Sequence, residues 1–158
     1  MTLLRTFVIN WNWKAALTSS LCRASLFFVV NLPAGVALGL RAMLTELAFR
    51  GVISGLMGTI TQVFSRSSHS WAALIILPAI GHTLEYIVHR TAGTPRLGQS
   101  VAASVAFSVV TTSFNLFAMR RGALIVGAEE QSLIDDFRQL PGLFVSYLRA
   151  GASLLWIL

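Results

Sequence analysis

Long apolar segments alternate with short polar joints along this chain. Four apolar stretches, each near the ~20 residues that a helix needs to cross a bilayer core, cover residues 20–40, 42–64, 71–89 and 99–119. The joints between them are Arg41, the run Ser65–Ser70 and the run Arg90–Gly98. Because helices with short connections pack as antiparallel neighbours, the pattern predicts an all-α fold, a polytopic transmembrane helical bundle with four spans.

The two flanking regions have a different pattern. In residues 1–19, Leu4, Phe7 and Trp11 fall on one helical face, which predicts an amphipathic helix lying at the membrane interface. The four spans make up residues 20–121. In the C-terminal region, 122–158, an amphipathic helix is expected over 128–140 and is expected to break at Pro141 and Gly142. Residues 142–158 form either a short fifth span or, as we prefer, a helix lying on the membrane or on a partner.

Composition supports the membrane assignment. The chain is 55% hydrophobic and 11% charged, whereas soluble domains carry about 25% charged residues. Its net charge of +6 comes from basic residues placed singly or in pairs at the edges of the apolar segments. That placement is typical of topology signals and excludes nucleic acid as the expected partner.

The distribution of basic residues predicts an orientation. With four spans, one side of the membrane carries Arg5, Lys14, Arg23, Arg66, Arg120 and Arg121, and the other carries Arg41, Arg90 and Arg96. The richer side is expected to be cytoplasmic. We therefore expect an integral protein of a bacterial cytoplasmic (cell inner) membrane with its N-terminus in the cytoplasm.

Small and polar residues gather on particular helix faces. In the second segment one arc holds Arg50, Gly51, Ser54, Gly55, Gly58, Thr59 and Gln62. Gly51–Gly55 and Gly35–Gly39 have the GxxxG spacing that lets helix backbones approach closely. In the fourth segment Ser104, Ser108, Thr111 and Asn115 form one stripe, which we interpret as hydrogen-bonding contact between helices rather than a pathway.

Five ionisable residues interrupt the apolar segments. Glu46 and Arg50 share a face of the second segment, and His82, Glu85 and His89 share a face of the third. Ionisable residues inside membrane spans are costly and mark functional-site candidates. The predicted topology places all five in the outer half of the membrane, where a hairpin brings the two faces together. We therefore predict one shared polar site, with Glu46, Arg50, His82 and Glu85 as candidate catalytic residues.

The same residues raise the question of a metal. His82, Glu85 and His89 are residue types that bind a divalent ion such as zinc. His82 and His89, however, are two helical turns apart, about 10 Å along the axis, which is too far for easy binding of one ion. We expect no cofactor and keep a metal as the weaker alternative.

One stretch, Thr45-Glu46-Leu47-Ala48-Phe49-Arg50-Gly51, resembles the first motif of the CAAX-protease and bacteriocin-processing membrane family, E-E-x-x-F-R-G. Pro78-x-x-x-His82 resembles the second motif and Thr111-x-x-x-Asn115 the third. The resemblance implies intramembrane peptide hydrolysis, with Glu46 as base and Arg50 as its partner. Thr45 stands where the family has its first glutamate, Pro78 where it has phenylalanine, and Thr111 where it has histidine.

Three functions remain open at this point. The first, which we favour, is a non-catalytic accessory or structural subunit of a membrane assembly, with the lipid bilayer and other membrane subunits as partners. The second is a degenerate glutamate-dependent intramembrane hydrolase. The third is a small transporter or proton path, because intramembrane Glu and His residues suit proton relays.

Overall fold

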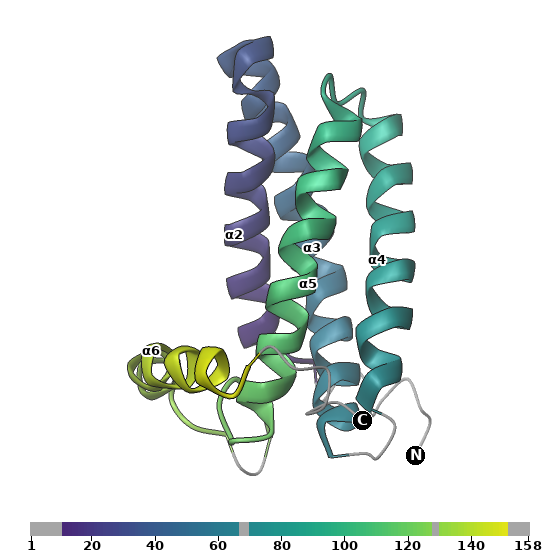
Figure 1. The fold of residues 1–158 in the computed structure, drawn as a ribbon. Helices are drawn as coiled ribbons and strands as arrows, with labels where there is room; N and C mark the ends of the chain where they lie inside the picture. Colours follow the sequence, from purple (N-terminus) through teal and green to yellow (C-terminus); the bar gives the residue numbers. More distant parts are fainter. Residues whose placement is uncertain (1–10, 67–69, 128–129, 152–158) are drawn as a thin grey trace.

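A computed structural model describes residues 11–66, 70–127 and 130–151, and within these residues the chain forms five α-helices and no strand. The helices are α2 (Trp13–Asn31), α3 (Val36–Ser65), α4 (Ser70–Thr91), α5 (Leu97–Met119) and α6 (Leu133–Arg149). Figure 1 shows α2–α5 side by side as long rods and α6 lying across one end of the bundle. We call this end the α6 end, and the end with the α2–α3 and α4–α5 turns the hairpin end. The expected all-α bundle is confirmed.

The first hairpin turns earlier than we predicted. A 3₁₀ helix, Leu32–Ala34, ends α2, and Gly35 has a φ of 117°, a backbone conformation that L-residues with a side chain rarely adopt. Pro33 cannot continue the hydrogen bonding of α2. Arg41, which we expected at the joint, lies inside the 30-residue α3 instead. The boundary at residue 41 is therefore wrong, because hydropathy does not register a turn built from apolar residues.

The helix α2 also begins earlier than the predicted first span. Asn12 caps it by accepting a hydrogen bond from Ala15 N. Residues 13–19 therefore continue a long helix of the bundle rather than forming an interfacial segment, and residues 1–10 lie outside the described part. Lys14 was expected on the polar side of an interfacial helix, but its ammonium group is fully buried and lies 2.6 Å from Asp136 Oδ2.

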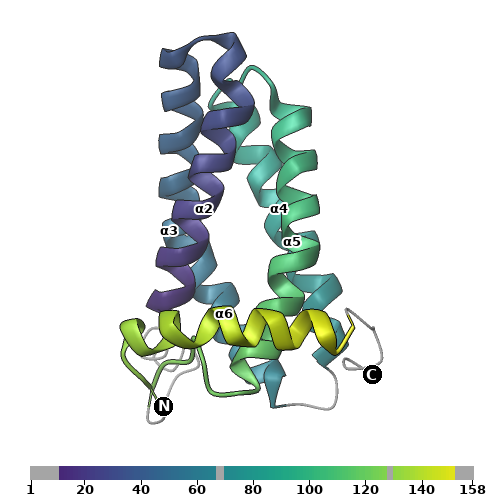
Figure 2. The same cartoon turned by 60° about the vertical axis from the view of Figure 1, so that its left-hand side comes forward.

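The C-terminal helix continues through the expected break. Ser132 caps α6, and the helix runs unbroken past Pro141 and Gly142, both of which are exposed. Tyr147 fixes the later turns, because its ring is buried and its hydroxyl lies 2.7 Å from Ser113 Oγ on α5. Figure 2 shows α6 crossing the bundle rather than running along it. Residues 152–158 lie outside the described part.

The loop before α6 closes the α6 end of the bundle. Its four apolar residues, Ala123–Val126, are each at least nine-tenths buried. Asn12 Nδ2 donates to Leu124 O at 2.9 Å, and Gln62 Nε2 donates to Val126 O at 2.8 Å. These side chains satisfy loop carbonyls that water would otherwise have to solvate. We call residues 123–126 the end plug.

Packing between α2 and α3 relies on the predicted arc of small residues. An added Cβ at Gly58 would lie 2.4 Å from Ala15 Cβ, and one at Gly55 would overlap the ring of Trp11. Gly51, by contrast, has no atom within 4 Å of the added Cβ. The close approach therefore occurs at Gly55, the second residue of the expected Gly51–Gly55 pair, and at Gly58, three residues further along α3.

The distribution of apolar and polar side chains is inverted relative to a soluble protein. Buried positions on the four long helices include Arg23, Asn31, Glu46, Arg50, Glu85, His89, Ser100 and Ser104, whereas exposed positions include Leu21, Val29, Leu44, Val52, Val63, Ile75, Ile87 and Val109. Among the described residues, α2 with its 3₁₀ turn (Trp13–Ala34) and α5 are long and apolar enough to cross a membrane.

Candidate functional site

The five predicted residues meet in one buried ionic cluster. Glu46 on α3 accepts a hydrogen bond from Arg50 Nε at 2.8 Å, one turn along the same helix. Its second oxygen lies 3.0 Å from His89 Nε2 on α4. Both Glu46 and His89 are fully buried. The predicted pairing of Glu46 with Arg50 is present, and it is extended across the helix interface by His89.

The second carboxylate, Glu85, lies on the other side of Arg50. Its Oε1 is 3.0 Å from Arg50 Nη2 and accepts a hydrogen bond from Ser104 Oγ on α5 at 2.6 Å. Its Oε2 is 2.5 Å from His82 Nδ1. Arg50 thus lies between two fully buried carboxylates, and each of these has at least two donors. Breaking such a pair would leave an uncompensated charge in a low-dielectric interior.

Arg23 on α2 joins this cluster, and sequence reasoning missed it. We had placed Arg23 near the end of a span as a topology signal, but α2 starts at Trp13, so Arg23 lies in mid-helix and is only 5% exposed. Its guanidinium donates to Ser104 O at 3.2 Å and to the hydroxyls of Ser104 and Ser108. A helix predicted to start at Trp13 would have placed Arg23 in mid-helix and so would have indicated that its side chain is buried.

The hairpin end of the cluster is closed by further contacts. His89 Nδ1 lies 2.8 Å from Thr94 Oγ1, and its ring stacks on Phe27 with the centroids 4.1 Å apart. Asn31 Nδ2 donates to Ser100 Oγ at 2.8 Å, and Asn31 Oδ1 accepts from the backbone N–H of Arg96. In the predicted polar stripe on α5, Ser104 and Ser108 hydrogen-bond to other helices, as we interpreted the stripe, whereas Thr111 and Asn115 line a cavity.

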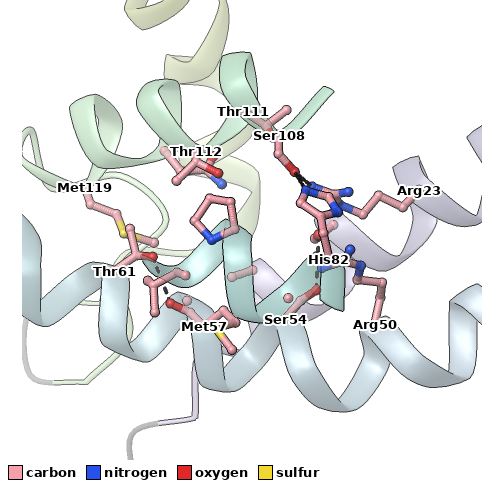
Figure 3. A pocket seen from close by; sticks show the side chains of 17 residues that line it. Arg23, Arg50, Ser54, Met57, Thr61, His82, Ser108, Thr111, Thr112 and Met119 are labelled. Carbon is pink, nitrogen blue, oxygen red and sulfur yellow. Dashed lines mark hydrogen bonds between the residues drawn. The ribbon is translucent and has the colours of Figure 1, made fainter. Parts of the chain in front are cut away.

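A polar cavity of about 80 Å³ lies beside the cluster, on the side of the α6 end. Figure 3 shows Arg23, Arg50 and His82 gathered at one part of its wall, with Met57, Thr61 and Met119 farther along. All four long helices contribute lining residues, but neither Glu46 nor Glu85 is among them. The two carboxylates therefore lie behind the arginines, away from the cavity.

The motifs of the family resemblance converge on this cavity in part. Arg50, Pro78, His82, Thr111 and Asn115 all line it. Glu46, the residue that the resemblance implies as the base, is fully buried, does not line the cavity, and is held by Arg50 and His89. A base that activates water needs a free lone pair directed at that water. In this geometry Glu46 is a partner of Arg50 rather than an exposed base.

Ser108, His82 and Glu85 are aligned as nucleophile, base and orienting acid would be. Ser108 Oγ lies 2.8 Å from His82 Nε2, and His82 Nδ1 contacts Glu85. Ser108 Oγ, however, also accepts a hydrogen bond from the Arg23 guanidinium and is in a side chain only 3% exposed. A charged donor on the oxygen withdraws the electron density that attack on a carbonyl carbon requires. We therefore interpret Ser108, His82 and Glu85 as part of the hydrogen-bond network of the ionic cluster rather than as a catalytic triad.

The residues weighed as metal ligands do not form one centre. His82 contacts Glu85 and His89 contacts Glu46, so the two imidazoles serve different carboxylates. Across 11–66, 70–127 and 130–151, no group of three His, Cys, Asp or Glu side chains is placed to hold a metal ion.

Comparison with known proteins adds no relative. No family model matches the chain, and neither a curated protein nor a solved structure matches it. The features available for assigning a function are therefore the helical bundle, its buried ionic cluster and the adjoining cavity.

Proposed function

We propose that the chain is a multi-pass membrane protein whose helices α2–α5 all cross the bilayer. The support is the inverted distribution of side chains, with valine, leucine and isoleucine outward on all four helices and the mid-helix residues Arg23, Glu46, Arg50 and Glu85 inward. The shortest of the four rods, α2, has 19 residues and continues into the 3₁₀ turn. At 1.5 Å per residue these lengths match a hydrocarbon core of about 30 Å.

The α6 end faces the cytoplasm in this proposal. Arg66, Arg120, Arg121, Arg138 and Arg149 lie on segments at this end, and Arg41, Arg90 and Arg96 lie toward the hairpin end. An excess of basic residues marks the cytoplasmic side. The ionic cluster then falls in mid-membrane and toward the outer leaflet.

The helix α6 lies in the cytoplasmic interface in this proposal. Its buried Asp136 and Tyr147 face the bundle, while Ile134, Phe137 and Leu148 are exposed on one side. Asp135, Arg138, Gln139 and Ser146 are exposed on another side. A helix crossing the bundle with separate apolar and polar exposed faces suits the headgroup boundary.

The role that we propose is a non-catalytic accessory or structural subunit of a membrane assembly. One observation carries the non-catalytic part: both intramembrane carboxylates are fully buried and matched by donors, and neither lines the cavity. The cluster therefore links α2–α5 to one another and holds them in register. A subunit of this size, with apolar surface on all four long helices, presents faces on which other membrane helices pack.

The test of this role is cross-linking in the native membrane, followed by extraction and purification of the tagged chain. Glu46→Gln serves as the matched variant, because it removes a charge but keeps the shape and one acceptor oxygen. A stoichiometric second polypeptide cross-linked to the wild type, and retained by any Glu46→Gln protein that folds, is expected. A chain recovered only as itself would contradict the accessory role.

A second candidate function is the glutamate-dependent hydrolase. The observation that favours it is the convergence of Arg50, His82 and Asn115 on one cavity. It requires a rearrangement that turns Glu46 from His89 toward the cavity. Cleavage of a quenched fluorescent peptide in proteoliposomes, abolished by Glu46→Gln and by His82→Ala at unchanged unfolding midpoints, would support it and overturn the non-catalytic proposal.

A further inference from the structure

One of the cationic side chains that line the cavity, Arg23, has no anionic partner in contact with it among the described residues. The Arg23 side chain is only 5% exposed, yet no carboxylate in the described part of the chain lies within 4 Å of its guanidinium. Its terminal nitrogens donate only to neutral oxygens of Ser104 and Ser108. Its Nε is buried without any acceptor. Buried charges are normally paired, because the desolvation of an unpaired one is costly.

A second guanidinium flanks the same part of the cavity. Arg50 Nη2 lies 3.0 Å from Glu85 Oε1 but is not aligned with it for a hydrogen bond. Glu46 and Glu85, the two carboxylates in contact with Arg50, do not line the cavity. A ligand in the cavity would therefore meet the two arginines first and the carboxylates only behind them.

The rest of the wall limits the ligand. Hydroxyl and amide groups of Thr111, Thr112 and Asn115 line one side, while Met57 and Leu77 offer apolar surface. A volume of about 80 Å³ holds several waters or one small ion, since one water needs about 10–15 Å³ on this measure. This volume suits a small anion beside the two arginines.

We propose that this cavity binds a small monocarboxylate, with the carboxylate against Arg23 and Arg50 and a short aliphatic part against Met57 and Leu77. Arginine is the natural partner for a carboxylate, because its planar donors match the two oxygens. The bound anion gives Arg23 the direct ionic contact that it lacks within the described part of the chain. This site is independent of the accessory role, which requires only the bundle and its outer surface.

The test is thermal unfolding of the purified full chain in detergent, titrated with sodium acetate or sodium butyrate at constant ionic strength. Ligand that binds only the folded state raises the midpoint in a saturable way, by about 3 °C at excess ligand. Sodium chloride is the control for a site that takes any anion. A saturable rise with both carboxylates, larger than with chloride, is expected.

Two variants locate the site. Arg23→Gln keeps hydrogen-bond donors but removes the charge, and it should weaken carboxylate binding at least tenfold. Thr111→Leu fills the cavity without touching a charge and should abolish the shift, which keeps the test sharp if Arg23→Gln does not fold. Arg41→Gln, on an exposed residue away from the cavity, should change nothing. No shift with the wild type, an equal shift with chloride, or an unchanged shift in Thr111→Leu would overturn the proposal.

Discussion

Glu46 Oε2 and His89 Nε2 lie 3.0 Å apart, although the two residues belong to different helices and are 43 positions apart in the chain. Both side chains are fully buried. The contact fixes the register of α3 against α4, because a slip by one residue would leave two polar groups unpaired in the bundle interior. Glu46, Arg50 and Glu85 extend this relationship to a row that alternates carboxylate and guanidinium.

The buried pair Lys14–Asp136 is predicted to hold α6 on the bundle. Lys14→Met leaves Asp136 charged and unpaired, which should cost about 3–5 kcal/mol locally and release α6. The measurement is hydrogen–deuterium exchange, in which α6 should lose protection while α3 and α5 keep theirs.

The control for that variant is the exposed pair Arg138–Asp135 on the same helix, with side chains 77% and 52% exposed. Arg138→Gln should change the free energy of unfolding by less than about 1 kcal/mol. If Lys14→Met proved as mild as Arg138→Gln, the ion pair would not be what anchors α6.

The contact of Gly58 with Ala15 is predicted to set the distance between α2 and α3. Gly58→Ala forces a Cβ to within 2.4 Å of Ala15 Cβ and should destabilise the bundle by about 1–3 kcal/mol. Ala15→Gly in the same chain should restore much of that loss. Denaturant unfolding in micelles measures both.

Gly51, seven residues earlier in the same helix, is the matched control because an added Cβ there has no atom within 4 Å. Gly51→Ala should be neutral or stabilising by up to about 1 kcal/mol, since alanine favours the helix over glycine. Equal losses from Gly51→Ala and Gly58→Ala would contradict the proposed packing.

The topology is tested by cysteine labelling in intact cells. Cys22, the single cysteine, is exposed on mid-α2 and should resist a membrane-impermeant maleimide, because the proposed topology makes it face lipid. In a Cys22→Ser background, Thr91→Cys at the hairpin end should react from outside. Arg138→Cys on α6 should react only after the membrane is permeabilised. The reverse pattern, or reaction at both ends in intact cells, would refute the orientation.

The sequence was sufficient for the helical class and for the convergence of Glu46, Arg50, His82, Glu85 and His89, because helical spacing and a hairpin determine which faces meet. It was not sufficient for the ends of the helices. The burial of the first turn of α2 depends on neutralisation of Lys14 by Asp136, 122 residues away, and no local window contains that information. The burial of Arg23 was missed for the same reason.

Two other features depend on tertiary contacts. The helix α6 passes through Pro141 because Tyr147 and Asp136 anchor it on both sides of that position. The end plug of residues 123–126 is buried because Asn12 and Gln62 satisfy its backbone. Neither pairing leaves a pattern in the sequence.

The central claim is that the ionic cluster, in which Arg23 and Arg50 balance Glu46 and Glu85, holds the helices together. One comparison of unfolding free energies in micelles tests this claim most directly. Arg50→Met leaves Glu46 and Glu85 with one cation, Arg23, and should lose about 3–5 kcal/mol. Glu46→Gln combined with Arg50→Met restores the balance of one carboxylate and one guanidinium. We predict that the double variant is more stable than Arg50→Met alone. A double variant as unstable as the single one, or less stable, would contradict the account.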